Sequence, residues 1–138
     1  MLHTKILDSA IAKIEIAKAE KFISSSKFGA SIFFIGTVRD FNEDKKVTGI
    51  TYDSHDALVI KSFEEIYNEA DDKLKIKDKA VFIEHIKGYV KLGEISIIIA
   101  VGPSSSPSLG RTEHSHISPW LVSVADTVLL NPVLLAPL

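Results

Sequence analysis

An arginine at the end of an apolar segment is the strongest candidate for chemistry in this sequence. The segment "GASIFFIGTVRDF" spans residues 29–41 and delivers Arg39 close to its end. A guanidinium is always charged, and its planar fork of donors suits phosphate or carboxylate groups when a rigid strand end aims it. The alternative is a surface arginine paired with Asp40 or Glu43, and the pattern alone favours that alternative. No glycine-rich phosphate loop accompanies the segment, so spacing by itself is weak evidence for an anion site.

Histidines are the next candidates. His85 lies in the middle of an apolar segment, and without an identifiable partner a half-buried structural histidine is favoured over a general base. His55 lies between Asp53 and Asp56 and has the neighbours to bind a metal, but helix capping explains these carboxylates equally well. His114 and His116 point to one side of an extended chain, a pattern too common to indicate zinc.

The sequence also excludes several classes of site. It contains no cysteine, which removes disulfides, thiolate metal ligands and cysteine nucleophiles. The serines at 104–106 lack the strand–turn–helix context of a serine hydrolase. Basic residues are interleaved with acidic ones at a net charge of −2, so no stripe that could follow a nucleic-acid backbone is visible. We predict no metal site, no cofactor and no nucleic-acid partner.

Length and composition indicate one globular domain with a substantial core, since 46% of the 138 residues are hydrophobic and 25% are charged. No segment approaches the roughly 20 uninterrupted apolar residues of a membrane helix, and the first residues do not resemble a secretory signal. We therefore predict a cytoplasmic protein without a membrane partner.

The elements that must position Arg39 follow from hydrophobic periodicity. Residues 3–8 fit a short edge strand, and a helical stripe follows. Residues 30–39 form a near-continuous apolar run, which predicts a central strand covered on both faces, and residues 46–54 are its predicted antiparallel partner. A long helix runs from Asp56, a plausible N-cap, to Leu74. Two further strands, "KAVFIEHIK" and "EISIIIAVG", are joined by "GYVKLG". This order predicts an α+β sandwich with an antiparallel or mixed sheet and two main helices.

The character of the chain changes at Pro103. Serine and proline become frequent, and no lysine occurs after Lys91. Such a change is typical of a linker or tail, although Ser118 followed by a proline can begin a short apolar helix. We divide the chain into a domain of residues 1–102 and an atypical tail of residues 103–138.

Three ordered segments resemble the large, catalytic subunit of molybdopterin synthase. "GASIFFIGTVRD" is similar to the family's glycine-alanine, phenylalanine, glycine-x-valine-arginine strand. "GITYDSHDALVIKSFEEIYNEA" resembles its next strand and long helix, and "VFIEHIKGYVKLGEISIIIAVG" resembles its β-hairpin. The resemblance runs in order from Ile6 to Gly102, and three motifs at suitable separations make it specific.

The resemblance implies an α/β-hammerhead fold and a dimer of large subunits, each holding a small ubiquitin-like sulfur-carrier subunit. Such enzymes convert cyclic pyranopterin monophosphate into molybdopterin, with sulfur from the small subunit's C-terminal thiocarboxylate. Arg39 matches the family's phosphate-side arginine, and Thr37 and Val38 line the same strand end. These three residues are the predicted substrate-binding site. His85 and Lys87 match a histidine and a basic residue that we assign to support of the fold.

The tail departs from the family pattern. The resemblance implies a substrate-binding histidine-arginine pair that falls by register near Ser105 and Ser106, and both serines are uncharged. The family's catalytic lysine and the lysines after its proline-x-tryptophan segment are absent, although "SPW" stands at 118–120. Serine or leucine cannot replace a lysine amine that acts as nucleophile or proton carrier. The catalytic residues therefore stay unassigned.

Three explanations compete for the tail. It is a shifted reading frame or altered gene end, a divergent non-catalytic homologue that binds a second copy or the sulfur carrier, or a different active site built from Arg111, His114 and His116. The abrupt loss of lysine favours the first, and we predict little or no synthase activity for the chain as written. A generic α+β domain with an unrelated anion ligand is the remaining alternative.

Overall fold

The structure is a computed structural model that describes residues 1–25, 29, 31–39, 41–42, 45–46, 48–53, 56–74 and 78–103. This part of the chain contains two helices and seven strands. In chain order they are β1 (Leu2–Asp8), α1 (Ile16–Ile23), β2 (Ile32–Thr37), β3 (Phe41–Asn42), β4 (Lys45–Lys46), β5 (Gly49–Tyr52), α2 (Asp56–Leu74), β6 (Lys79–Lys91) and β7 (Ile95–Pro103).

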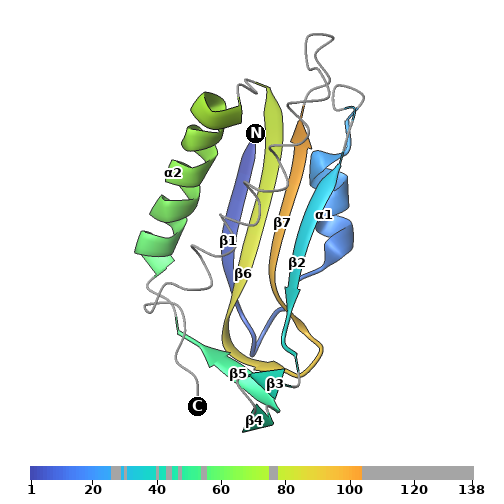
Figure 1. Cartoon of the computed structure of the whole chain (residues 1–138), viewed down its shortest axis with the longest axis vertical. Coiled ribbons are helices and arrows are strands. Elements are labelled where there is room, and N and C mark those ends of the chain that lie inside the picture. Colours follow the sequence, from blue (N-terminus) through green and yellow to red (C-terminus); the bar gives the residue numbers. More distant parts are fainter. Residues whose placement is uncertain are drawn as a thin grey trace.

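Five of the strands form one mixed sheet (Figure 1). The strand order is β1-β6-β7-β2, in which β1 runs parallel to β6 and the other neighbours are antiparallel. β5 pairs antiparallel with the later part of β6, and β3 and β4 form a separate two-stranded hairpin. The mixed sheet and two helices confirm the predicted α+β class, and β1 is an edge strand of this order as predicted.

The strand β2 also lies at one end of this order and not in its centre. The sequence predicted residues 30–39 as a central strand paired with residues 46–54, and both points are wrong. β2 pairs with β7, and β5 pairs with β6. Ile32 and Phe34 pack against one core of the sheet and Phe33 against the other. An edge strand between two cores therefore has the same unbroken apolar run as a central strand.

β6 is one long strand that changes partners at a glycine. Its residues up to Lys87 pair with β1, and those from Gly88 onward pair with β5. Gly88 has a φ of +95°, a left-handed conformation that favours glycine, and a side chain there would collide with Ser9. The sequence predicted "GYVKLG" as a connection between two strands. That is wrong in extent, because β6 continues to Lys91 and the turn follows at Gly93.

Each face of the sheet packs against one helix. Successive side chains of a strand point to opposite faces, so Val81 and Ile83 face α2 whereas Ala80 and Phe82 face α1. The α2-side core consists of Val59, Phe63, Ile66, Val81, Ile83, Ile97, Ile99 and Val101. The α1-side core consists of Leu7, Ile14, Ala19, Ile23, Val38, Tyr52, Ala80, Phe82, Ile86, Val90, Ile98 and Ala100.

The two helices lie where periodicity predicted them. α2 begins at Asp56, so this aspartate is the first helical residue and not the cap before it. Neither described helix has the combination of length and apolar character that a bilayer crossing requires. The predicted division between residues 102 and 103 stays a prediction, because residues 104–138, with the predicted short helix, lie outside the described part of the chain.

Candidate anion site at the end of β2

The end of β2 is fixed by backbone hydrogen bonds to the β6–β7 turn. The Val38 N–H donates to the Glu94 carbonyl at 3.1 Å, and the Gly93 N–H donates to the Val38 carbonyl at 2.7 Å. Gly93 has a φ of +83°, so the turn depends on a left-handed residue. These two reciprocal bonds, called the clamp below, hold the chain rigidly at Val38, the residue before Arg39.

A register shift just before this clamp changes the direction of the strand end. Gly36 pairs with Ile97, whereas Thr37 pairs with Ile95, so β7 carries one extra residue at this point. The Ser96 hydroxyl donates to the Gly36 carbonyl at 3.3 Å. A bulge of this kind re-aims the side chains that follow it.

The three predicted binding residues do not face the same way. Thr37 and Arg39 are exposed, whereas Val38 is 2% exposed and belongs to the α1-side core. Burial of Val38 and the backbone clamp therefore present the Thr37 hydroxyl and the Arg39 guanidinium to solvent. These two groups are free to meet an anion, and Val38 serves as their anchor. Their binding role itself stays a prediction.

His85 is completely buried, not half-buried as the sequence predicted. It is 1% exposed, and its Nδ1 donates to the Ile86 carbonyl at 2.7 Å. Its ring meets the Tyr52 ring edge-on at 5.2 Å. Burial lowers the pKa of His85, and the hydrogen bond to Ile86 opposes this only in part. A neutral, enclosed imidazole fits the predicted supporting role better than proton transfer to a ligand.

Lys87 joins the bend of β6 to the start of α2. Its Nζ lies 2.9 Å from Asp56 Oδ2. The hydrogen bond and charge of Asp56 raise the pKa of Lys87, and the charges of Asp8 and Asp53 add to this. Asp56 is thus an ion-pair partner, and His55 of the alternative metal site lies outside the described residues. Within the described ranges, no three His, Asp or Glu side chains gather as a metal site would require.

A half-buried pair between His3 and Glu84 had no signal in the sequence. His3 Nε2 lies 2.9 Å from Glu84 Oε2, and the Glu84 side chain is 5% exposed. The His3 ring stacks on Phe82 with 4.3 Å between centroids, and Phe22 packs beside both rings. The two partners come from neighbouring strands that are far apart in sequence. No local pattern indicates such a pair, because it depends on the parallel register of β1 and β6.

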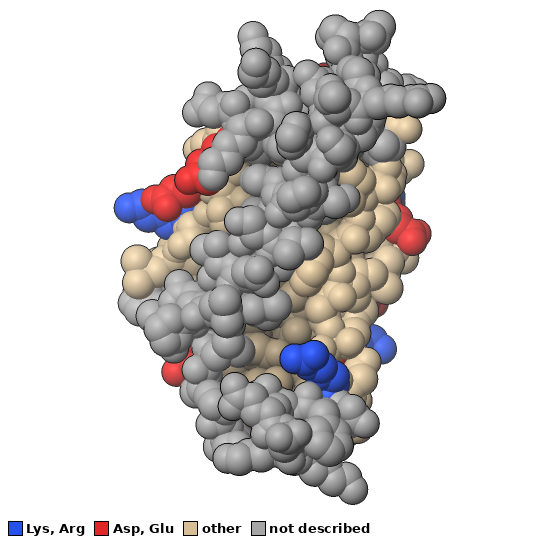
Figure 2. Space-filling model, viewed as in Figure 1, with Lys and Arg blue, Asp and Glu red and all other residues tan. Residues whose placement is uncertain are grey.

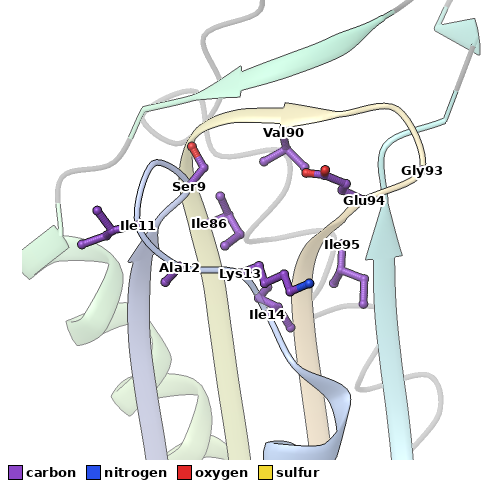
Figure 3. A pocket seen from close by; sticks show the side chains of 10 residues that line it. All are labelled: Ser9, Ile11, Ala12, Lys13, Ile14, Ile86, Val90, Gly93, Glu94 and Ile95. Carbon is purple, nitrogen blue, oxygen red and sulfur yellow. The ribbon is translucent and has the colours of Figure 1, made fainter.

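A cavity of about 550 Å³ lies against the other side of the same β6–β7 turn (Figure 3). The sequence analysis missed it, because the segment between β1 and α1 has no periodic pattern and forms a wall only when it folds over β6. None of Thr37, Val38 and Arg39 lines it. Its lining residues are Ser9, Ile11, Ala12, Lys13, Ile14, Ile86, Val90, Gly93, Glu94 and Ile95.

Charged side chains of the described residues occur in separate groups of both signs on the face shown in Figure 2, with uncharged surface between them. The remaining candidates of the sequence analysis lie outside the described residues. These are the serines at 104–106, Arg111, His114, His116 and the segment 118–120.

The sequence around this strand end matches a known protein family. The model of the family described as "MoaE protein" matches residues 10–108 of the 138. The chain belongs to the MoaE protein family. The matched range includes β2, the clamp and both helices, and it ends shortly after the point at which the composition changes.

Relatives named "Molybdopterin synthase catalytic subunit" share substantial identity with this MoaE-family chain. The protein of Emericella nidulans is 42% identical over 84 residues, which cover 61% of this chain and 42% of the relative. The protein of Pyrococcus abyssi is 34% identical over 107 residues, which cover 78% of this chain and 68% of the relative. The chain thus spans less than half the length of the fungal relative and about two thirds of the archaeal one.

Solved structures share the fold at low identity. Molybdopterin synthase from Staphylococcus aureus matches with a TM-score of 0.70 at 20% identity, over 86% of this chain and 80% of that one. A complex of subunits 1 and 2 of molybdopterin-converting factor from Helicobacter pylori matches with a TM-score of 0.62 at 19% identity, over 92% of this chain and 77% of that one. These matches support the MoaE-type fold.

Proposed function

We propose that this chain is the large subunit of a molybdopterin synthase in molybdenum cofactor biosynthesis. The reaction converts cyclic pyranopterin monophosphate into molybdopterin, with sulfur from the C-terminal thiocarboxylate of a small ubiquitin-like subunit. The family match over residues 10–108 carries this proposal. The names of the relatives and of the two-subunit Helicobacter pylori complex support the proposed partner and reaction. A dimer of large subunits completes the proposed assembly.

Arg39 and Thr37 are the proposed ligands of the substrate phosphate. Both side chains are exposed next to the clamped residue Val38. A guanidinium forms two parallel hydrogen bonds to a phosphate, and a hydroxyl can add a third donor. Because the clamp fixes the backbone before binding, little conformational entropy is lost when the phosphate is bound.

The chemistry of sulfur transfer needs an amine that the tail does not provide. No lysine follows Lys91 in residues 92–138, whereas the resemblance to the family implies a catalytic lysine in that part of the chain. We propose that this chain binds the small subunit and the substrate but forms little or no product. The alternative is a non-catalytic homologue that acts as a dimer or sulfur-carrier binding module.

Reconstitution tests the proposal. The chain is mixed with a small subunit carrying a thiocarboxylate and with cyclic pyranopterin monophosphate, and molybdopterin is measured. The Pyrococcus abyssi relative is the positive control. We expect binding of the small subunit without substantial product. Turnover close to that of the relative would contradict the proposed loss of activity.

A chimera separates the proposal from its alternative. Residues 1–103 are joined to the corresponding C-terminal segment of the Pyrococcus abyssi relative, and we expect this protein to form product. In the chimera, Arg39→Ala should raise the KM for the pterin substrate roughly 10- to 150-fold, since a hydrogen bond to a charged group is worth about 1.5–3 kcal/mol. Lys5→Ala on the exposed face of β1 is the matched control and should leave KM unchanged. A chimera that binds the small subunit but makes no product would favour the non-catalytic module.

A further inference from the structure

The cavity beside the β6–β7 turn has an apolar floor. Ile14, Ile86 and Val90 line it and are 6%, 2% and 2% exposed, so each belongs to the α1-side core while one of its surfaces meets the cavity. The volume of about 550 Å³ lies in the range of small-molecule sites, which are roughly 300–1,000 Å³. An aliphatic group placed on this floor would be removed from water on one side, which is favourable.

Two opposite charges stand over this floor from different elements. Figure 3 shows the Lys13 ammonium and the Glu94 carboxylate extending over the cavity from the β1–α1 connection and from the β6–β7 turn. Neither side chain forms an ion pair with another residue in the described part of the chain. Both residues are exposed, so their charged ends stay hydrated until a ligand arrives.

We propose that this cavity binds a zwitterionic aliphatic compound of about dipeptide size. The ligand carboxylate meets Lys13, its ammonium group meets Glu94, and its aliphatic body lies on the floor formed by Ile14, Ile86 and Val90. A ligand with a single charge would leave one of the two protein charges unmatched, and an uncharged one would match neither. The inference goes beyond the proposed sulfur transfer and does not depend on it, because none of Thr37, Val38 and Arg39 lines the cavity.

The probe for the test is the dipeptide L-valyl-L-leucine, titrated into the full chain labelled with ¹⁵N and followed by NMR. We expect saturable shifts of the backbone amides that line the cavity, Ser9, Ala12, Gly93 and Glu94 among them. The same peptide with an acetylated N-terminus or an amidated C-terminus should bind weaker, by roughly two- to fivefold for each lost charge, as expected for ion pairs at an exposed rim. Absence of saturable shifts at millimolar dipeptide, or equal binding of the capped peptides, would overturn the proposal.

Variants that remove one protein charge test which end of the ligand contacts Lys13 and which contacts Glu94. Glu94→Gln should weaken the free dipeptide roughly two- to fivefold and leave the acetylated form unaffected, because that form has no ammonium group to lose contact with. Lys13→Gln should weaken the free dipeptide and leave the amidated form unaffected. Lys5→Gln and Glu64→Gln, at exposed positions on β1 and α2, are the matched controls. Equal weakening by these controls would show a general charge effect and refute the assigned contacts.

Discussion

The cores on the two faces of the sheet differ in whether they extend to the candidate sites. The α2-side core is built from α2, β6 and β7, and none of its members lines the described cavity or belongs to the end of β2. The α1-side core contains Val38, whose neighbour is Arg39, and also Ile14, Ile86 and Val90 of the cavity floor. One face therefore mainly stabilises the fold, whereas the other also holds the residues next to the two proposed sites. Substitutions on the two faces should therefore separate stability from binding.

The largest expected effect comes from Phe63→Ala on the α2 side. Phe63 is 0% exposed within the α2-side core, and truncation of a buried phenylalanine costs about 3–5 kcal/mol of unfolding free energy. Urea unfolding measures this loss. At urea concentrations below the unfolding transition, folded Phe63→Ala should bind inorganic phosphate with the same affinity as the native chain. A lower phosphate affinity in folded Phe63→Ala would contradict the division between the two faces.

His85 provides a pH-dependent test between the two faces: its strand position pairs with Ile97 of the α2-side core, and its ring contacts Tyr52 of the α1-side core. Burial lowers its pKa from the ordinary value of 6.5. As the pH falls through 6.5, the unfolded chain takes up a proton that the folded chain resists, so stability present above this pH is lost.

We expect the unfolding free energy to fall more steeply with decreasing pH in the native chain than in His85→Leu. The difference between the two slopes should be at most about 1.4 kcal/mol per pH unit, the value for one proton. Urea unfolding at several pH values between neutral and mildly acidic measures the two slopes. Parallel slopes would show that His85 is not the group responsible.

Gly93→Ala should disturb the clamp at Val38 and have a smaller effect on stability than Phe63→Ala. A side chain at Gly93 meets no atom within 4 Å, so the penalty comes from the φ of +83° alone. That conformation costs an alanine roughly 1–2 kcal/mol. We expect a loss of that size in urea unfolding, together with weaker binding of inorganic phosphate at Arg39.

Gly93→Asn is the control for this variant, because asparagine adopts the left-handed conformation more readily. It should recover most of both losses. Full phosphate affinity in Gly93→Ala would show that the turn does not position Arg39.

The smallest effect is expected for Lys87→Met. The ion pair with Asp56 is partly exposed on both sides, so salt screens it and its contribution is small. Asp56 raises the pKa of Lys87, so the contribution is present at neutral pH and is lost as the pH rises through the folded-state pKa. Thermal unfolding should show a small difference at low salt that disappears in high salt or at strongly alkaline pH. A difference that persists in high salt would indicate packing of the lysine stem.

Much of the fold followed from the sequence because helices carry their periodicity locally. The stripe from Val59 to Leu74 predicts α2 without reference to any other element. The place of β2 did not follow, because an apolar run reports contact with both cores and not the number of neighbouring strands. The bend at Gly88 was also hidden, since the pattern of β6 continues across it while its partner changes.

The candidate sites also differ in how much of them a local sequence pattern indicates. Arg39 was a candidate from its residue type and its position after an apolar segment, and its binding role stays a prediction. The clamp that fixes the preceding residue joins distant parts of the chain and had no sequence signal. The cavity and the His3–Glu84 pair had no sequence signal. In both cases the partners meet only through strand register or through a loop that folds over a strand.

The pairing of the sheet has a consequence for the order in which it forms. Every pairing within the five-stranded sheet involves β6 or β7, the last two described strands, and Leu2 pairs with Val81. Contacts so distant in sequence make folding slow, because a long loop must close before the pairs form. During synthesis β1, β2 and β5 are made before β6 and β7, the strands with which they pair. The apolar side chains of β2 therefore have no sheet to pack into until residues 79–103 have been made. The nascent chain is most exposed to aggregation during this interval.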